Sequence, residues 1–232
     1  MNKDILILLS GGADSLTLLH KAHKDGYNVV ACLTFEYGQI WKNELKYVKK
    51  QIKDFNIKYN KKVEHIIYKI NFNQIGNSLL LKHLIHGRNV VFLSIAGGIA
   101  ATLNAENIGM AATCTLDYDD GGKRVKFTYP DCSLNFIKKM QDTFNVAFET
   151  KINLYTPFAE LMKQDVIKEG LKLGVNYKDS WTCMENGKES CMKCESCKAR
   201  TEAFILNWEK DPAIKDWNKA LYYYMEVDKI DK

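Results

Sequence analysis

The 232-residue sequence has few of the features that divide a chain or insert it into a membrane. It contains only three prolines, no low-complexity tract and no internal repeat, so nothing marks a flexible linker. No stretch approaches the roughly 20 apolar residues of a membrane span, and the N-terminus lacks a basic leader with a cleavable apolar segment. We therefore expect a cytoplasmic protein with one domain, or one domain and a small appendage.

Charge of one sign is not concentrated in any part of the chain. Lysine and arginine number 33 against 28 aspartates and glutamates, and the two signs are interleaved in runs such as "KNELKYVKKQIKDF". Interleaving of this kind is typical of solvated helix faces, so we expect no direct nucleic-acid partner. The five histidines show no arrangement typical of a nucleophilic triad.

Apolar, β-branched runs alternate with helical patterns along the chain. The strand candidates are residues 4–9, 28–35, 62–70, 106–114 and 150–155. The helix candidates are roughly 14–25, 40–56, 89–104, 132–147 and 159–173. This alternation predicts an α/β fold with a doubly wound parallel sheet of about five strands and right-handed crossovers. In such sheets ligands bind beyond the carboxyl ends of the strands.

The stretch "SGGADS" at 10–15 lies between the first strand candidate and the first helix candidate. Backbone N–H groups at such a turn, together with the helix dipole, favour an anion, and the two glycines allow a phosphate to approach the backbone. A Walker A loop would need a lysine before the Ser or Thr, and this loop has none. The carboxylate of Asp14 would repel phosphate unless it caps the helix or holds Mg²⁺, and we expect Mg²⁺.

Four of the seven cysteines form the pattern C-x(7)-C-x(2)-C-x(2)-C, at Cys183, Cys191, Cys194 and Cys197. Two-residue gaps allow consecutive thiolates to bind one ion, and four thiolates form a closed, structural zinc shell. An iron–sulfur cluster is the alternative, and the long first gap and polar surroundings favour Zn²⁺ over it. We place this zinc-binding helical module at 179–232, after an α/β domain at 1–178 that contains the glycine loop.

These motifs carry a resemblance to a known family. "SGGADS" resembles the pyrophosphate-binding (PP) loop of the ATP pyrophosphatase superfamily, and its combination with the cysteines resembles the 7-cyano-7-deazaguanine synthases. Further stretches agree in order along the chain: "LTFEYGQ" at 33–39, "QIGNSLL" at 74–80, "HGRNVVFLSIAGGIA" at 86–100, "DY" at 117–118, "YPDC" at 129–132, "TPFAELMKQDVIKEGLKLGV" at 156–175 and "DSWTC" at 179–183. The implied fold is a Rossmann-like sheet of the adenine nucleotide alpha hydrolase type.

The resemblance also implies roles for individual residues. The ATP-binding segment comprises Leu8, Leu9, Ser10, Gly11, Gly12, Ala13, Asp14, Ser15, Leu16, Thr17 and Leu18. The catalytic residues implied are Asp14, Ser15, Arg88 and Lys163. The residues implied to bind a guanine-like substrate are Tyr37, Gln39, Arg88, Asp117, Tyr129 and Asp131. Carboxylates suit the N–H groups of such a base, tyrosines could stack on it, and Arg88 could face a phosphate or the substrate carboxylate.

The family activity implied is the ATP-dependent conversion of 7-carboxy-7-deazaguanine and ammonia to the nitrile in two rounds of adenylation, by a homodimer. This chain departs from the family pattern at Ile40 and Trp41, in the 112–116 stretch, in the extra residues 119–128 and at Ser133. These departures motivate one alternative, a defence-associated relative that transfers an adenylated 7-deazaguanine carboxylate to a protein amine. Two further alternatives are a tRNA-modifying enzyme of the superfamily and a non-catalytic nucleotide-binding module, against which the intact Ser10, Asp14 and Ser15 argue.

Overall fold

The computed structural model describes residues 3–39, 43–70, 85, 87–118, 124–185 and 187–227, with backbone alone at 115–118, 124 and 226–227. The sequence features at Ile40, Trp41, 74–80 and 119–123 lie outside the described residues. The strands are β1 (Asp4–Leu8), β2 (Asn28–Glu36), β3 (Glu64–Lys69), β4 (Asn107–Gly109), β5 (Thr115–Tyr118), β6 (Arg124–Phe127) and β7 (Asn153–Tyr155). The helices are α1 (Ala13–Lys24), α2 (Asn43–Tyr59), α3 (Arg88–Thr102), α4 (Leu134–Ala147), α5 (Lys163–Lys172), α6 (Glu195–Ile205) and α7 (Trp217–Val227), with 3-10 turns η3 (Pro130–Cys132) and η4 (Tyr177–Asp179).

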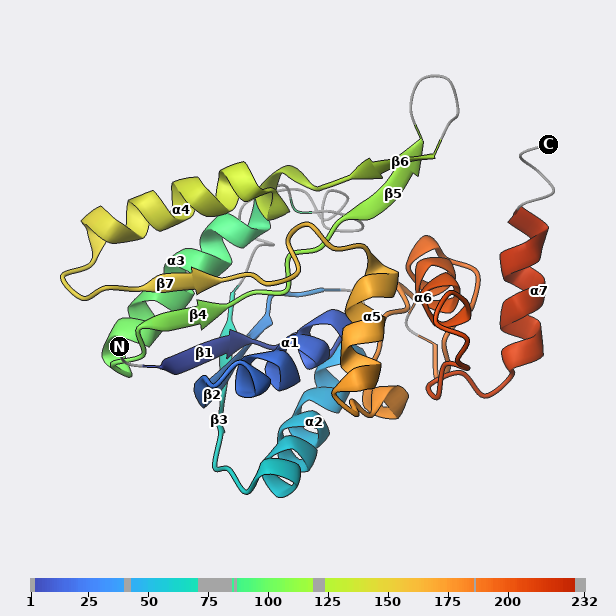
Figure 1. Ribbon diagram of the computed structural model, residues 1–232, viewed down its shortest axis with the longest axis horizontal. Coiled ribbons are helices and arrows are strands. Elements are labelled where there is room, and N and C mark those ends of the chain that lie inside the picture. Colours follow the sequence, from blue (N-terminus) through green and yellow to red (C-terminus); the bar gives the residue numbers. More distant parts are fainter. Residues whose placement is uncertain are drawn as a thin grey trace.

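Five strands form one parallel sheet in the order β3-β2-β1-β4-β7, which confirms the predicted α/β class (Figure 1). Each of the five predicted strands and five predicted helices is present. The β4 and β7 strands are shorter than predicted, with three residues each. The sequence analysis did not predict the antiparallel β5–β6 pair, which accounts for part of the 119–128 stretch.

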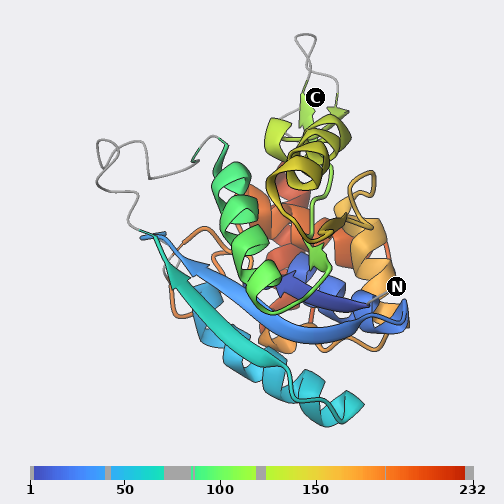
Figure 2. The same ribbon diagram turned by 90° about the vertical axis from the view of Figure 1, so that its left-hand side faces the viewer.

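Helices cover both faces of the sheet, as Figure 2 shows. Leu6 and Ile108 pack with α3 and α4 on one face, whereas Ile5 and Ile7 pack with α1, α2 and Val166 of α5 on the other. This division follows from the alternation of side chains along β1. Burial on both faces explains why the strands are continuous apolar runs in the sequence.

The C-terminal segment packs against the outer side of α1 and α5. Leu16 of α1 and Ile167 of α5 share a buried cluster with Phe204 of α6, and Trp217 of α7 packs against it. This contact brings α6 close to the N-terminus of α1, where the predicted ATP loop lies (Figure 1). Within the described residues, no helix is both long enough and apolar enough to cross a membrane.

Candidate active site and metal centre

The predicted PP loop joins the carboxyl end of β1 to α1. Gly11 has a φ of +96°, and a Cβ built there would lie 2.2 Å from the backbone oxygen of Glu44. The hydroxyl groups of Ser10 and Ser15 lie 3.1 Å apart, and the Gly12 N–H donates to Ser10 Oγ at 3.2 Å. Glycine at 11 is therefore required both by the backbone conformation and by the close approach of α2.

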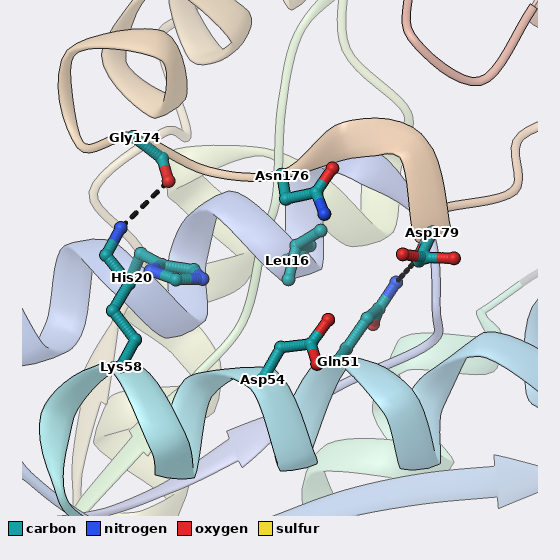
Figure 3. Close-up of a pocket in the computed structure, with 8 residues that line it drawn as sticks. All are labelled: Leu16, His20, Gln51, Asp54, Lys58, Gly174, Asn176 and Asp179. Carbon is teal, nitrogen blue, oxygen red and sulfur yellow. Dashed lines mark hydrogen bonds between the residues drawn. The ribbon is translucent and has the colours of Figure 1, made fainter.

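Two other segments, α2 and the chain around Trp181, form hydrogen bonds to the backbone of the loop. The backbone oxygen of Gly11 accepts hydrogen bonds from Gln51 Nε2 at 2.9 Å and from the Trp181 N–H at 3.1 Å. Gln51 Nε2 also donates to the Asp179 carbonyl oxygen at 2.7 Å, in a small pocket of about 60 Å³ between α1, α2 and the η4 segment (Figure 3). The loop therefore has a fixed connection both to α2 and to the chain that leads into the cysteine cluster.

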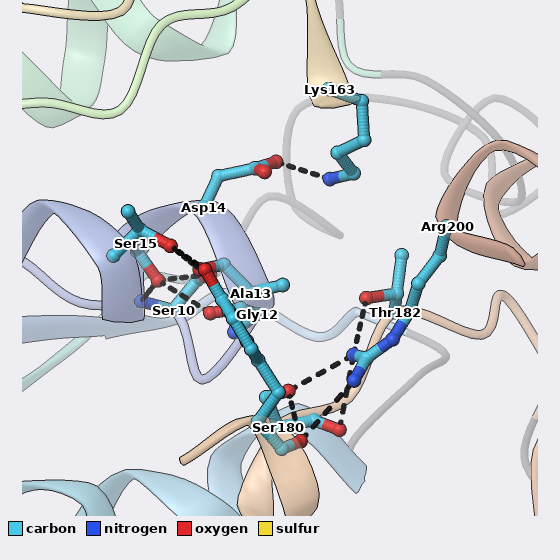
Figure 4. Close-up of polar contacts among 11 residues, drawn as sticks. Ser10, Gly12, Ala13, Asp14, Ser15, Lys163, Ser180, Thr182 and Arg200 are labelled. Carbon is cyan, nitrogen blue, oxygen red and sulfur yellow. Dashed lines mark hydrogen bonds and ion pairs between the residues drawn. The ribbon is translucent and has the colours of Figure 1, made fainter. Parts of the chain in front are cut away.

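Asp14 and Lys163 form an ion pair that joins the N-termini of α1 and α5 (Figure 4). The Lys163 ammonium group contacts only one of the two carboxylate oxygens of Asp14, Oδ2. The other, Asp14 Oδ1, is buried and has no hydrogen-bond partner among the described residues. A buried carboxylate oxygen without a partner is costly unless a proton donor or a cation satisfies it, so its environment fits an oxygen-binding cation such as Mg²⁺.

The loop opens into a cavity of about 680 Å³ beyond the carboxyl ends of the strands. Its walls come from the PP loop, the ends of β2 and β4, the N-termini of α2, α3 and α5, and the exposed side of α6. Besides Leu8, Leu9, Gly12 and Cys183, ten predicted site residues line it: Ser10, Ala13, Asp14, Ser15, Tyr37, Gln39, Arg88, Tyr129, Asp131 and Lys163. A volume of this size accommodates a nucleotide beside a second small molecule.

Arg88 begins α3 and is fixed by aromatic neighbours. Its Nη1 donates to Tyr37 Oη at 2.7 Å, and its guanidinium lies 5.3 Å from the ring centroids of Tyr37 and of Phe92. Tyr37 is only 9% exposed, and the Gln39 amide bonds to the backbone of Tyr37 and of Phe35. Gln39 therefore supports the end of β2, and the substrate roles of Tyr37 and Gln39 remain predictions.

Asp131 lies in η3, beside the N-terminus of α3 that carries Arg88. Its Oδ2 accepts from the Asn89 N–H at 3.1 Å, which satisfies one of the free N–H groups of the first turn of α3. Tyr129 is 44% exposed and makes an edge contact with Phe127, so it offers the more accessible of the two predicted stacking rings. Asp117 belongs to β5, and its side chain lies outside the described residues.

Glu44 is a functional candidate that sequence reasoning missed. It lies in the first turn of α2 and lines the cavity. Burial raises the pKa of its carboxyl to about 8, against the opposing effects of Arg88 and Lys163. In the sequence Glu44 resembles any acid at a helix N-terminus, a position that the helix dipole favours, and no local signal distinguishes it.

The four cysteines of the predicted metal motif come together. Their sulfur atoms all lie within 4.8 Å of one another, and those of Cys191 and Cys197 are 3.9 Å apart. A tetrahedral Zn²⁺ with Zn–S bonds near 2.3 Å would place its sulfurs about 3.8 Å apart, so the cluster fits a metal ion of this size.

Backbone N–H groups support the sulfurs. Cys183 Sγ accepts from the N–H groups of Glu185 and Cys191 at 3.4 and 3.3 Å, and Cys191 Sγ accepts from the Cys194 N–H at 3.3 Å. A hydrogen bond from Cys197 lowers the pKa of Cys194, the same contact raises the pKa of Cys197, and burial raises the pKa of Cys183. Cys194 is therefore the stabilised thiolate of the four, and the thiolate is the form of cysteine that binds metal.

The cluster is attached to the α/β domain through a buried aromatic contact. Trp181, 6% exposed, packs with the cysteines and stacks on Tyr47 of α2 with ring centroids 6.3 Å apart. Arg200 lies in α6 and is buried, at 4% exposure. Its guanidinium pairs with Asp211 and donates to Ser180 Oγ at 2.9 Å and Thr182 Oγ1 at 3.1 Å (Figure 4).

Comparison with known families bears directly on this arrangement. The sequence profile described as "Queuosine biosynthesis protein QueC" matches residues 4–207, which include the PP loop and all four cysteines. This chain belongs to the QueC family. It is 33% identical over 237 residues to the 7-cyano-7-deazaguanine synthase of Archaeoglobus fulgidus, with 96% of this chain and 95% of the relative covered. It is 34% identical to that of Rickettsia felis, with 90% and 98% covered.

Solved structures resemble this QueC family member more distantly. The NMN synthetase of Francisella tularensis has 15% identity and a TM-score of 0.47, with 100% of this chain and 87% of that chain covered. The U34-tRNA thiolase NcsA of Methanococcus maripaludis, solved with its 4Fe-4S cluster, has 13% identity and a TM-score of 0.47, with 98% and 71% covered. The family assignment rests on the sequence matches.

Proposed function

We propose that this protein is an ATP-dependent 7-cyano-7-deazaguanine synthase, which makes the nitrile from 7-carboxy-7-deazaguanine and ammonia. The observation that carries the proposal is the single cavity into which the PP loop, Arg88, Lys163 and Asp131 all face. The cavity is therefore surrounded by an anion-binding loop and by groups suited to a carboxylate and a guanine-like base. Membership of a family with named synthases supports this choice of substrate.

The reaction consists of two adenylations. The substrate carboxylate attacks the α-phosphorus of ATP and pyrophosphate leaves; ammonia then attacks the acyl carbon, AMP leaves and the nitrogen loses one proton. In the second round the amide oxygen attacks the α-phosphorus of a second ATP, and departure of AMP with that oxygen, together with both N–H protons, forms the nitrile.

Residues of the site suit these steps. The N–H groups and hydroxyls of the PP loop would hold the pyrophosphate portion of ATP, and Lys163 and Arg88 would offset its charge. Asp14, through its unpaired Oδ1, would bind the Mg²⁺ that accompanies ATP, and Mg²⁺ supplies charge neutralisation at the phosphates. Tyr129, Asp131 and Asp117 are proposed to recognise the deazaguanine. The four cysteines are proposed to bind Zn²⁺ in the module at 179–232, and a homodimer is proposed as the assembly.

The test is incubation of the purified protein with ATP, Mg²⁺, ammonium and 7-carboxy-7-deazaguanine, followed by mass analysis of bases and nucleotides. The expected products are the 7-cyano base and AMP, two AMP for each nitrile. Omission of ammonium and a Ser15→Ala variant are the controls, and both should abolish the nitrile. AMP without a nitrile would contradict the proposal, and mass analysis of a co-expressed protein would then test a protein amine as the acceptor.

A further inference from the structure

Glu44 occupies a distinctive place beside the PP loop. Its backbone oxygen contacts Gly11, so the first turn of α2 is packed directly on the loop, and the residue lines the large cavity. Among the described residues no hydrogen bond and no ion pair engages the Glu44 carboxyl. A carboxyl at the edge of a reaction cavity, with no structural partner, is available to a ligand.

The surroundings of Glu44 keep a proton on it at neutral pH. Burial raises its pKa most, Arg88 of α3 and Lys163 of α5 lower it, Asp14 of α1 raises it, and the combined result is a pKa of about 8. The other titratable side chains of residues that line the cavity are Tyr37, Cys114, Tyr129, Asp131, Cys132, Cys183, Glu195, Lys198, Glu202 and Tyr224. A carboxylate with a pKa of about 8 is a stronger base than an exposed one. General bases are most effective when their pKa lies near the operating pH, which this pKa does.

We propose that Glu44 is the general base that takes the proton from the attacking nitrogen when ammonia displaces AMP. This inference rests on the proposed synthase function and adds the residue that handles the proton. The loop, Lys163 and Arg88 act on the phosphates and the carboxylate, and they are cations or hydrogen-bond donors that cannot accept this proton. Asp14 is already engaged with Lys163. Glu44 is the neighbouring group without such an engagement.

The step balances as follows. The nitrogen lone pair forms the C–N bond to the acyl carbon of the adenylate, Glu44 in its carboxylate form accepts one N–H proton, and the C–O bond to AMP breaks with its electron pair on AMP. The protonated carboxyl releases its proton to solvent before the next round. Adenylation itself transfers no proton from nitrogen, and it is therefore independent of this base.

The experiment compares the wild-type protein with Glu44→Gln in two assays. The first follows exchange of labelled pyrophosphate into ATP with 7-carboxy-7-deazaguanine and no ammonium, which reports adenylation alone. The second follows incorporation of labelled nitrogen, with total ammonium adjusted so that free ammonia is constant at every pH. The expected result is unchanged exchange and a loss of about 10²- to 10⁴-fold in nitrogen incorporation, the usual range for a lost general base.

The pH profile gives a second readout. The carboxylate form of Glu44 increases as pH rises towards its pKa of about 8. At constant free ammonia, nitrogen incorporation by the wild-type protein should therefore rise up to about that pH and then level off, and Glu44→Gln should lack this rise. Glu44→Asp should retain the rise at a reduced rate, because it keeps the base and moves it. Glu209→Gln, an exposed glutamate after α6, is the matched control and should behave as wild type.

Two outcomes would overturn the inference. If Glu44→Gln, folded by circular dichroism, lost pyrophosphate exchange as much as nitrogen incorporation, Glu44 would act on ATP or its cation. If nitrogen incorporation were unchanged, Glu44 would not be the base. If the wild-type protein itself formed no amide or nitrile, the proposed function would fail first, and the inference would fail with it.

Discussion

At the residue scale, Gly11 shows how tightly the ATP loop packs against α2. Its φ of +96° is unfavourable for any residue with a Cβ, and the space where a Cβ would lie is filled by the backbone oxygen of Glu44. The neighbouring Gly12 has an ordinary φ of −77° and a looser surrounding, with Ser10 Oγ at 3.2 Å from a built Cβ. The two glycines therefore have different roles: Gly11 permits the turn, and Gly12 faces the cavity.

Gly11→Ala should destabilise the protein by about 1–3 kcal/mol, the usual cost of such backbone strain, and displace α2 from the loop. The expected result is a lower melting temperature and a smaller stabilisation by ATP, measured by thermal unfolding with and without nucleotide. Gly98→Ala in α3 is the matched control, because nothing lies within 4 Å of its built Cβ. Equal melting temperatures for the two variants would show that the loop can relax around the extra methyl group.

At the scale of elements, Arg200 connects α6 to the segment that supports the loop. It pairs with buried Asp211 through Nε and Nη2, at 2.5 and 2.9 Å, and its Nη2 donates to the Tyr177 carbonyl oxygen at 3.2 Å. The chain from Tyr177 through Ser180 then reaches Gly11 through the Trp181 N–H. A charge network around one guanidinium therefore fixes the position of the cysteine module relative to the ATP loop.

Arg200→Leu should cost about 3–5 kcal/mol of stability, because it leaves Asp211 buried without its partner. We also expect a higher KM for ATP, because the segment behind Gly11 loses its anchor. Chemical denaturation and steady-state kinetics would measure both effects. Lys210→Leu, at an exposed position near the same turn, is the control and should change neither quantity. A variant that lost stability but kept the wild-type KM for ATP would show that the Arg200 network does not position the ATP loop.

At the scale of the whole molecule, the cysteine cluster and α6 close one side of the active-site cavity. Cys183 and Cys197 are buried, and α6 begins at the cluster and contributes Glu195, Lys198 and Glu202 to the cavity wall. A bound metal would therefore stabilise the fold and complete the site at the same time.

Removal of the metal by chelation, or by Cys194→Ser, should lower the melting temperature and reduce nitrile formation. Metal analysis of the purified protein should give one Zn²⁺ per chain and no visible absorption of an iron–sulfur cluster. Cys32→Ala, which alters a buried cysteine of β2 outside the cluster, should keep the full metal content. Iron and inorganic sulfide at stoichiometric amounts would overturn the zinc assignment.

The sequence by itself determined the parts of this protein that depend on local pattern. Apolar runs alternating with helical periods predicted the five parallel strands, the "SGGADS" turn predicted the loop, and cysteine spacing predicted the metal cluster. Only the tertiary structure decided the rest. It buried Tyr37 and Gln39 at the end of β2, placed Asp14 against Lys163, placed Glu44 at the cavity wall and buried Arg200 with Asp211. The physical reason is that burial and charge pairing are set by segments far apart in the chain, 149 residues apart for Asp14 and Lys163, and no local pattern encodes them.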